Sequence, residues 1–485
     1  MFENNQHLPQ TTPATQAYSA FLPWQKNCII GLAAFAGWFS SISSFIYFPA
    51  IPFIAADLGV GIGKINLTVT SYLIMSGIFP SLMGDAADRF GRRPVFLVAL
   101  TCYLAANIGL ALQSRFELLF LLRMLQSMGI SGTFSVTYGV LSDLFTPAER
   151  GSYSGVISFF LNTPPSLGPI FSGLLLLRWR WNSIFWFLSV ATPFCLVPMA
   201  ICLPETARNL VGNGTVRPAM SMNRAPVRLL TAPQDGGCDV SCWDMGKRRA
   251  VPNPFSSLKL VRRPGTALIL AVYAVGYSVY VCLQASISTI FLDAYQVAGV
   301  VSGLVYLPFG VACAVSAFAT GLLLDRNFRR TAAECKIPVV DARLASSLEE
   351  FPIEKARLRT IGLFVGLGAV LLMGYGWLLQ FHVTVAGPLV AQFFMGLTIQ
   401  TLFTALNTLL VDVHQDCPST AQAACNFVRC EAAAAWLAGL DPLLGHLGPG
   451  WCFVTLGAVL FLAVPALHIL QRRGMQWRQA RTTKT

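Results

Sequence analysis

Two ionisable residues lie close together inside a long apolar stretch of this sequence, residues 420–444. Arg429 and Glu431 are about 10 and 12 residues into it, hence about 15 and 18 Å along a helix and near the middle of a bilayer. Residues two apart on a helix point in roughly opposite directions, so the two charges cannot simply neutralise each other. Desolvation disfavours a charged carboxylate, so Glu431 could bind and release a proton near neutral pH. The alternative for Glu431 is an inert acid that faces a neighbouring helix.

A third charge within an apolar stretch is Arg123, about 7 residues into 116–144. At 1.5 Å per residue it lies about 10 Å inside that stretch, and Gln126 shares its helix face. A charge at such a depth usually faces other protein or a water-filled cavity. The alternative is an arginine whose head snorkels to the membrane interface.

Polar and aromatic side chains recur at helical spacing in other apolar stretches. Tyr273, Tyr277, Tyr280 and Gln284 follow one another at offsets of 0, 4, 7 and 11, which is one helix face. Such a face could line a cavity for a planar or amphipathic ligand, although aromatic residues at this spacing are also common in packing. The candidate residues for a substrate cavity are Gln126, Asn162, Tyr277, Gln284, Gln400 and Asn407.

A dense charged turn separates two apolar stretches. Residues 84–94 read G-D-A-A-D-R-F-G-R-R-P, and residues 321–330 repeat the pattern as G-L-L-L-D-R-N-F-R-R. A carboxylate at a helix end can pair with arginine and complement exposed N–H groups. We expect a clamp that holds two halves of the molecule together in one transport state; the alternative is a solvated loop that only fixes topology. The clamp candidates are Gly84, Asp88, Arg89, Gly91, Arg92, Arg93, Asp325 and Arg326, the second copy having Phe328 where the first has Gly91.

Composition indicates that membrane-spanning helices carry these residues. The 485 residues are 54% hydrophobic and only 12% charged, with a mean hydropathy of +0.59. A soluble chain has about 25% charged residues. The sequence predicts an all-α membrane protein of twelve transmembrane helices in two six-helix bundles, a 6 + 6 pseudo-symmetric repeat around a central cavity. The expected spans are 28–55, 66–83, 95–113, 116–144, 151–177, 181–203, 265–292, 300–324, 360–380, 385–411, 420–444 and 451–471.

The distribution of basic residues fixes the expected orientation. Of the 34 lysines and arginines, four fall in expected outer loops and two inside spans, and the rest lie on one side. By the positive-inside rule that side is the cytoplasm, and both termini lie there. The net charge of +12 therefore needs no nucleic acid partner. The expected parts are a polar tail (1–27), a first bundle (28–203), a cytoplasmic linker (204–264), a second bundle (265–471, with a cytoplasmic loop at 325–359) and a basic tail (472–485).

The charged turn carries a resemblance to a known family. Residues 84–93 match the signature loop of the major facilitator superfamily at every defining position, and the twelve-span pattern extends the resemblance over nearly the whole chain. Residues 119–129 resemble the second motif of the superfamily, whose arginine, here Arg123, is implicated in proton coupling. Residues 168–173 are similar to the antiporter motif of drug:proton exporters, which implies a kink at Gly168, Pro169 and Gly173.

Smaller resemblances favour one branch of that family. Residues 203–206 (L-P-E-T), residues 351–357 and the pair Asn426 and Arg429 resemble fungal twelve-span exporters of the quinidine-resistance and citrate-exporter type. Several proton-coupled relatives have an acid in the first span, but 28–55 contains none. Glu431 is then the best-placed carboxylate, and we expect Glu431, Arg429 and Arg123 to carry proton coupling.

These features predict a secondary active transporter that exports small organic molecules, such as drugs or secondary metabolites, in exchange for protons. Alternatives are a citrate-like organic-anion exporter, a nutrient carrier or a membrane sensor that does not transport. No H-E-x-x-H, G-x-S-x-G or G-x-x-x-x-G-K-[ST] motif occurs, which argues against an enzyme or an ATP-driven pump. Cys238 and Cys242 lack further ligands nearby, so we expect no metal and no cofactor. The expected form is a monomer in the plasma membrane, with small-molecule substrate, protons and lipids as its partners.

Overall fold

The computed structural model describes residues 18–145, 153, 157, 160, 163–218, 220–230, 258–295, 303–336, 351–414 and 418–482. Asn162, Cys238 and Cys242 lie outside the described residues. Within the described parts of the chain the regular structure is entirely helical.

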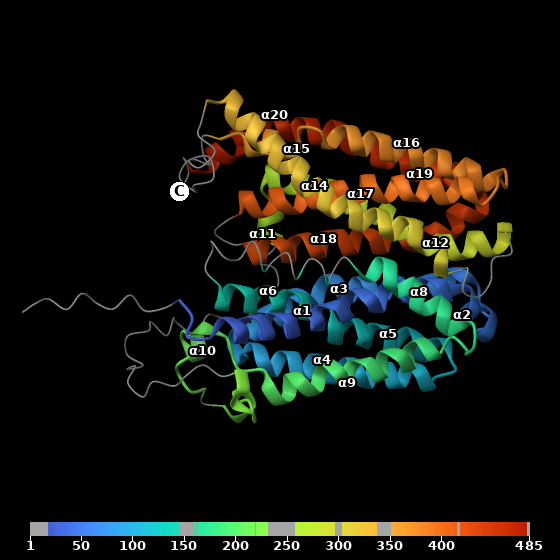
Figure 1. Cartoon of the computed structure of the whole chain (residues 1–485). Helices are drawn as coiled ribbons and strands as arrows, with labels where there is room; N and C mark the ends of the chain where they lie inside the picture. The colour runs from blue at the N-terminus through green and yellow to red at the C-terminus, as the bar shows by residue number, and fades with distance from the viewer. Residues whose placement is uncertain are drawn as a thin grey trace, which may run out of the picture.

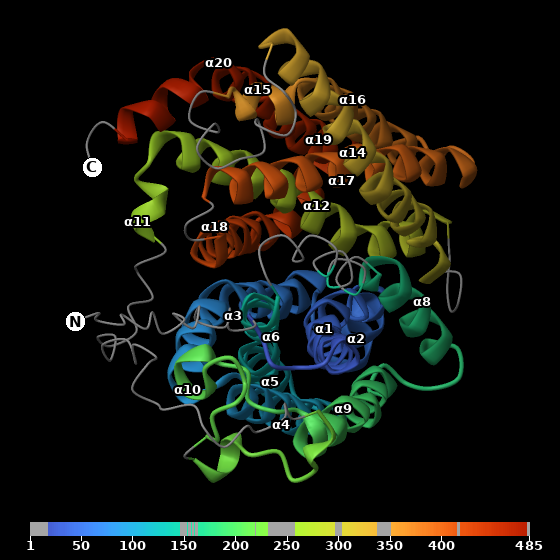
Figure 2. The same ribbon diagram turned by 60° about the vertical axis from the view of Figure 1, so that its left-hand side comes forward.

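The first part of the chain forms one group of helices, seen in the lower half of Figure 1 and end-on in Figure 2. We call it the N-terminal group. The short segments α10 (Arg208–Val211), η2 (Ser221–Asn223) and η3 (Arg228–Leu230) follow it and lie beside its end. The group comprises α1 (Pro23–Phe45), η1 (Phe48–Ala50), α2 (Ile51–Leu58), α3 (Ile62–Phe90), α4 (Arg92–Leu112), α5 (Phe116–Ile130), α6 (Thr133–Leu144), α8 (Pro164–Leu176) and α9 (Ser183–Cys202).

The second part of the chain forms the C-terminal group, in the upper half of Figure 1. Its longest helix, α12, continues well beyond the length needed to cross a bilayer. The members are α11 (Leu258–Val261), α12 (Pro264–Tyr295), α14 (Leu307–Glu334), α15 (Ile353–Leu358), α16 (Ile361–Gln380), α17 (Ala386–Val413), α18 (Pro418–Ala438), α19 (Leu440–Phe461) and α20 (Ala463–Thr482).

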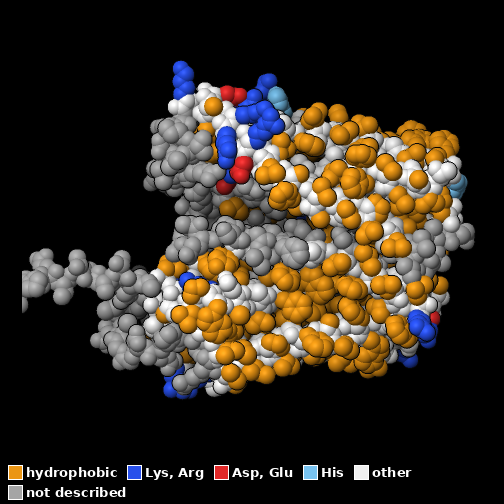
Figure 3. Space-filling model, viewed as in Figure 1, with side chains coloured by type: hydrophobic (Ala, Val, Ile, Leu, Met, Phe, Trp, Pro, Cys, Tyr) orange, Lys and Arg blue, Asp and Glu red, His pale blue; other side chains and the backbone are white. Residues whose placement is uncertain are grey.

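Many of these helices could cross a membrane. Within the described ranges, nine are long and apolar enough to do so. Orange apolar side chains cover the side of the molecule in Figure 3, while charged ones lie at its two ends. The protein is therefore a multi-pass membrane protein. The nine helices are Pro23–Leu58, Ile62–Phe90, Arg92–Leu112, Ser183–Cys202, Pro264–Tyr295, Leu307–Glu334, Ile353–Gln380, Ala386–Val413 and Leu440–Ala480.

Three of the twelve expected spans are not among these nine. The span at 116–144 divides into α5 and α6 at Ser131 and Gly132. Much of the first half of 151–177 lies outside the described residues, and α8 is the part that the structure describes as a helix of its own. The span at 420–444 corresponds to α18, whose arginine, glutamate and amide side chains lower its hydropathy. Polar residues inside spans are costly and usually functional, so a hydropathy criterion passes over α18.

Two helix ends differ from the ends of the apolar stretches. Helix α14 continues to Glu334, into the segment 325–359 that is expected to be a cytoplasmic loop. Helix α18 stops at Ala438, before the end of the expected span 420–444, and a new helix, α19, begins at Leu440. A glycine with a left-handed backbone, Gly448 (φ 71°), interrupts α19 just before a proline. Asp441 lies in the first turn of α19, as a helix-terminal acid.

The two groups meet along one half of their length. We call the end with Arg92, Arg357 and Arg478 the basic end, and the opposite end, where Arg180 pairs with Asp57, the distal end. At the distal end α12 packs against η1 and α2, and α3 packs along α18 (Figure 1).

Hydrogen bonds join the groups at the distal end and at mid-length. Ser288 Oγ donates to the Phe48 carbonyl (3.1 Å), and Asn426 Nδ2 donates to the carbonyl of Ser76 (2.7 Å), which lies halfway along α3. The ion pairs of Arg92, Arg357 and Arg478 at the basic end stay within one group each.

Candidate functional site

Arg123 lies inside the N-terminal group and has no solvent exposure. Its guanidinium lies between two aromatic rings, 4.1 Å from the centroid of Tyr47 and 4.4 Å from that of Tyr72. Its Nη1 donates to Gln126 Oε1 (2.6 Å) and to the Ser43 carbonyl (3.3 Å), while Nε and Nη2 have no hydrogen-bond partner. Two cation–π contacts thus take the place of a carboxylate, which argues against the snorkelling alternative.

Gln126, expected in the substrate cavity, belongs instead to this enclosed network. It is fully buried and donates to Asn107 Oδ1 (2.7 Å). The hydroxyl of Ser43, whose carbonyl accepts from Arg123, lies 2.5 Å from the hydroxyl of Tyr103. This polar chain holds Arg123 in one position. Sequence reasoning missed Tyr47, Tyr72 and Tyr103, since nothing in the sequence assigns them to one arginine.

Arg429 lies at the boundary between the groups and is half-buried. Its Nε and Nη2 both donate to Asn426 Oδ1 (3.1 and 2.7 Å), and its Nη1 donates to Tyr273 (3.4 Å). The guanidinium also lies over the Tyr277 ring, 4.8 Å from its centroid. Two residues of the helix face predicted on α12, Tyr273 and Tyr277, therefore contact Arg429.

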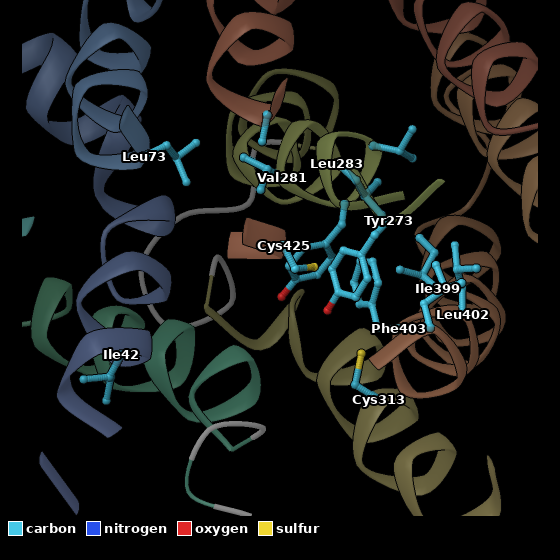
Figure 4. Close-up of a cluster of buried hydrophobic side chains, with 14 of the residues drawn as sticks. Ile42, Leu73, Tyr273, Val281, Leu283, Cys313, Ile399, Leu402, Phe403 and Cys425 are labelled. Atoms are coloured by element: carbon cyan, nitrogen blue, oxygen red, sulfur yellow. The ribbon is translucent and has the colours of Figure 1, made fainter. Parts of the chain in front are cut away.

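Aromatic rings from three helices surround this arginine. Tyr273 stacks on Phe403 of α17 at 5.0 Å between centroids, and Tyr280 stacks on Phe309 of α14 at 5.6 Å. Figure 4 shows the rings of Tyr273 and Phe403 side by side, with Cys425 close to them. We call Tyr273, Tyr277, Tyr280, Phe309 and Phe403 the aromatic wall.

The other expected cavity residues lie around the aromatic wall. Asn407 is half-buried and donates to the Tyr273 hydroxyl (3.2 Å). Gln400, also half-buried, is near Thr404 on its own helix. Gln284 is buried, donates weakly to Tyr280 (3.5 Å) and leaves its Oε1 without a partner. The structure therefore brings Asn407 and Gln284 into contact with the aromatic wall, at Tyr273 and Tyr280, but not Gln126.

Glu431 faces away from Arg429, toward α3. An added Cβ on Gly77 of α3 would lie 2.8 Å from Glu431 Oε1, so the carboxyl group packs where that glycine leaves room. Glu431 is half-buried overall, and its Oε1 is buried and has no hydrogen-bond partner among the described residues. An unpaired buried carboxyl oxygen is unfavourable when charged, so this position suits the protonated form.

The charged turn at the basic end contains a buried ion-pair network. Arg92 Nη2 lies 2.6 Å from Asp88 Oδ1, and Arg92 Nε lies 3.0 Å from Asp143 Oδ2 at the end of α6. Gly139 makes room for it, because a Cβ there would lie 2.7 Å from the guanidinium carbon. In this conformation the ion pairs of Asp88 remain in the N-terminal group. A Cβ added to Gly84 would lie 3.9 Å from Ser135 Cβ, which is ordinary packing.

Glu205, which follows α9, caps the start of α4. Its carboxylate accepts hydrogen bonds from the backbone N–H groups of Arg92 (2.7 Å), Arg93 (3.2 Å), Thr206 (3.0 Å) and Ala207 (3.0 Å). Burial raises the pKa of Glu205, and these four N–H groups oppose that increase. An acid at a helix N-terminus also complements the helix dipole. The L-P-E-T segment was singled out in the sequence, but only by resemblance and without this role.

Gly91 allows Glu205 to reach that position. Its backbone has φ 107° and ψ 156°, a region that residues with a side chain avoid. A Cβ on Gly91 would lie 2.8 Å from the Glu205 carboxyl carbon. Arg93 stabilises the same contact between the start of α4 and the segment after α9, because it donates to the carbonyls of Leu203 (2.8 Å) and Met222 (2.5 Å). Arg89 is exposed at the end of α3.

The second copy of the charged turn is arranged differently. Asp325 and Arg326 are exposed on α14. The counterpart of the Arg92 pair is Arg357 of α15, whose Nε donates to Asp412 of α17 (2.8 Å). Sequence reasoning missed Asp143 and Asp412. Each is an acid at the end of an apolar stretch, but the sequence alone does not show which arginine it contacts.

The antiporter motif lies against both groups. A Cβ on Gly168 would lie 2.9 Å from the backbone nitrogen of Ile46, so α8 packs closely on the end of α1. A Cβ on Gly303, just before α14 of the C-terminal group, would contact the Pro169 carbonyl and lie 3.0 Å from Gly173 Cα. These small residues form part of the distal contact between the groups.

The comparisons with known proteins agree with the helical fold and with the charged turn. The chain is 31% identical to Citrate exporter 1 of Aspergillus niger, over 94% of this chain and 87% of that protein. It is 30% identical to Multidrug transporter AQR1 of Candida glabrata, over 96% and 79% of the two chains. The crystal structure of the human organic anion transporter MFSD10 (TETRAN) has the same fold, with a TM-score of 0.56 at 15% identity over 91% of this chain and 99% of that one. The family model described as Major Facilitator Superfamily matches residues 33–437, and the chain belongs to that family of transporters.

Proposed function

We propose that this transporter exports small organic molecules from the cytoplasm by alternating access, in exchange for protons. It would do so in the plasma membrane, with twelve spans as two six-helix bundles and with both termini in the cytoplasm. The names of the fungal relatives, a citrate exporter and a multidrug transporter, support export of organic compounds.

The observation that carries the proposal is the position of Glu431. The half-buried Glu431 of α18 lies against Gly77 of α3, with its Oε1 unpaired among the described residues, and these two helices must separate if the distal side is to open. A protonated carboxyl group tolerates this packed position, whereas a charged one favours water. Proton binding at Glu431 would therefore stabilise the conformation seen here, and proton release would favour the distal-open one.

The described conformation suits a state that receives its substrate from the cytoplasm. Hydrogen bonds and close glycine contacts join the groups from the distal end to mid-length. The arginine pairs at the basic end remain within each group. An exporter needs such a state to load its cargo before the distal contacts open.

Replacing Glu431 with glutamine tests proton coupling. The amide keeps the shape of the carboxyl group but cannot release a proton, so the variant is expected to lose uphill, pH-driven flux by at least about ten-fold, the effect of a 1.4 kcal/mol change. Downhill exchange of substrate is expected to survive. Both are measured with purified protein in proteoliposomes, with substrates found by comparing metabolites exported with and without the gene.

The matched control is Glu117→Gln, an acid in the first turn of α5 that is exposed and remote from the interface. It is expected to leave uphill flux unchanged. Undiminished uphill flux through Glu431→Gln would reject this carboxyl group as the proton carrier. An absence of any flux through the unaltered protein would favour the sensor alternative.

The orientation is tested by cysteine labelling on a background without other cysteines. An impermeant thiol reagent is expected to label Ser114→Cys and Leu447→Cys in intact cells, because both sites lie at the distal end, proposed to face outward. It is expected to miss Ala219→Cys and Thr482→Cys until the cells are permeabilised. The reverse pattern would invert the topology.

A further inference from the structure

Arg429 is the accessible cation of the central region. A guanidinium has five N–H donors. Three of those on Arg429 donate to Asn426 and Tyr273, so two remain for another acceptor. Asn426 is itself held in place, because its amide nitrogen donates to Ser76 across the groups. The guanidinium is thus fixed in direction while α3 and α18 are in contact.

No carboxylate among the described residues neutralises Arg429. Glu431 is on the same helix but lies against Gly77 of α3. On α12 and α17 the neighbouring polar groups are Tyr273 and Asn407, which are neutral. The other buried arginine of the centre, Arg123, is enclosed by two tyrosines and is inaccessible. Arg429 therefore carries a positive charge that is half-buried, lies beside Tyr273 and Tyr277 and has no carboxylate partner among the described residues.

Aromatic rings lie beside this charge; Tyr277 is half-buried, and the other rings of the aromatic wall are buried. The aromatic wall extends from Arg429 along α12 and onto α17 and α14, with ring centroids 5.0 to 6.1 Å apart. Phe45 of α1 continues it from the other group, 5.9 Å from Tyr280. Aromatic rings favour offset or edge contacts with another ring.

We propose that Arg429 and the aromatic wall bind an organic monoanion with a planar, aromatic body. The guanidinium receives the carboxylate of the ligand, and Tyr277 and Phe403 contact its ring. This inference rests on the proposed transport function and names the substrate class for the same site. Asn426 is a positioning residue, since it directs the guanidinium without needing to touch the ligand.

The same geometry disfavours a polycarboxylate such as citrate. Only one guanidinium is accessible, so a second and a third carboxylate would face phenyl and phenol rings. A buried charge without a partner is costly. The chain would therefore differ in cargo from its relative that is named as a citrate exporter.

The test compares three probes on the purified full-length protein at pH 7 by isothermal titration calorimetry. The probes are 2-naphthoate, 2-naphthamide and citrate. A carboxylic acid has a pKa of about 4, so naphthoate is charged, while naphthamide has the same shape without the charge. Naphthoate is expected to bind about ten-fold tighter than naphthamide, because hydrogen bonds to charged groups are the stronger ones. Citrate is expected to bind at least as weakly as naphthamide.

Variants assign the preference to the residues. Arg429→Gln is expected to abolish the preference for naphthoate while naphthamide still binds, which also shows that the variant is folded. Arg429→Lys should retain part of the preference, and Phe403→Ala should weaken both naphthalene probes equally. Arg472→Gln, on the exposed surface of α20, is the matched control and should change nothing.

Equal affinity for naphthoate and naphthamide, tighter binding of citrate, or no binding of any probe would overturn the proposal. A preference for naphthoate that persists in Arg429→Gln would do the same. Binding needs no gradient and no flux, so this inference and the proposed proton exchange can fail independently.

Discussion

Gly91→Ala is expected to remove most of the folded protein from a membrane preparation. Alanine avoids the backbone conformation at this position (φ 107°), at a cost of about 1–3 kcal/mol. Its Cβ would also displace the Glu205 carboxylate, which accepts four backbone N–H groups. Each buried N–H left without a partner costs about 1–3 kcal/mol more. The measurement is the yield and the thermal unfolding temperature of the purified variant.

The matched control is Gly84→Ala, in the same charged turn. Gly84 lies inside α3, where alanine is the better helix former by about 1 kcal/mol, and the nearest atom to an added Cβ is Ser135 Cβ at 3.9 Å. Its unfolding temperature is expected to match or exceed that of the unaltered protein. If Gly91→Ala were as stable as Gly84→Ala, the glycine would not be needed for the cap at α4.

What the sequence could predict was local. A run of about twenty apolar residues is a property of one segment, and it located nine helices of the structure. The end of an apolar run does not mark the end of a helix, because a helix can continue into polar sequence. Arg329 and Arg330 are exposed on a helix that extends past the apolar region.

What the sequence could not predict was long-range pairing. The helix face with Tyr273 and Tyr277 was predicted, but its contact with Arg429 joins residues more than 150 positions apart. Glu205 and Arg92 are 113 positions apart, and no spacing rule links them. A single sequence shows which residues can ionise, but the partners that stabilise each charge depend on the packing of helices.

The partners also explain why two buried arginines should respond differently to the same substitution. Arg92 pairs with Asp88 and the buried Asp143, whereas Arg123 is enclosed by Tyr47 and Tyr72 and has no carboxylate partner among the described residues. Breaking a buried ion pair by removing one partner costs about 3–5 kcal/mol. Removing an unpaired buried charge instead relieves its desolvation, which offsets the lost cation–π contacts of about 0.5–2 kcal/mol each.

Arg123→Met is therefore expected to change the free energy of unfolding by no more than about 1–2 kcal/mol while transport falls at least ten-fold. Arg92→Met is expected to lower the unfolding temperature markedly, because it leaves the Asp143 carboxylate buried and unpaired. Thermal unfolding and flux into proteoliposomes are measured on both variants at matched protein amounts. A strongly destabilised Arg123→Met would show that the tyrosine-enclosed arginine serves the fold. A stable variant that still transports would show that its charge serves neither the fold nor the coupling. We expect Arg123→Met to remain stable but to lose transport, because the charge of Arg123 serves transport and not the fold.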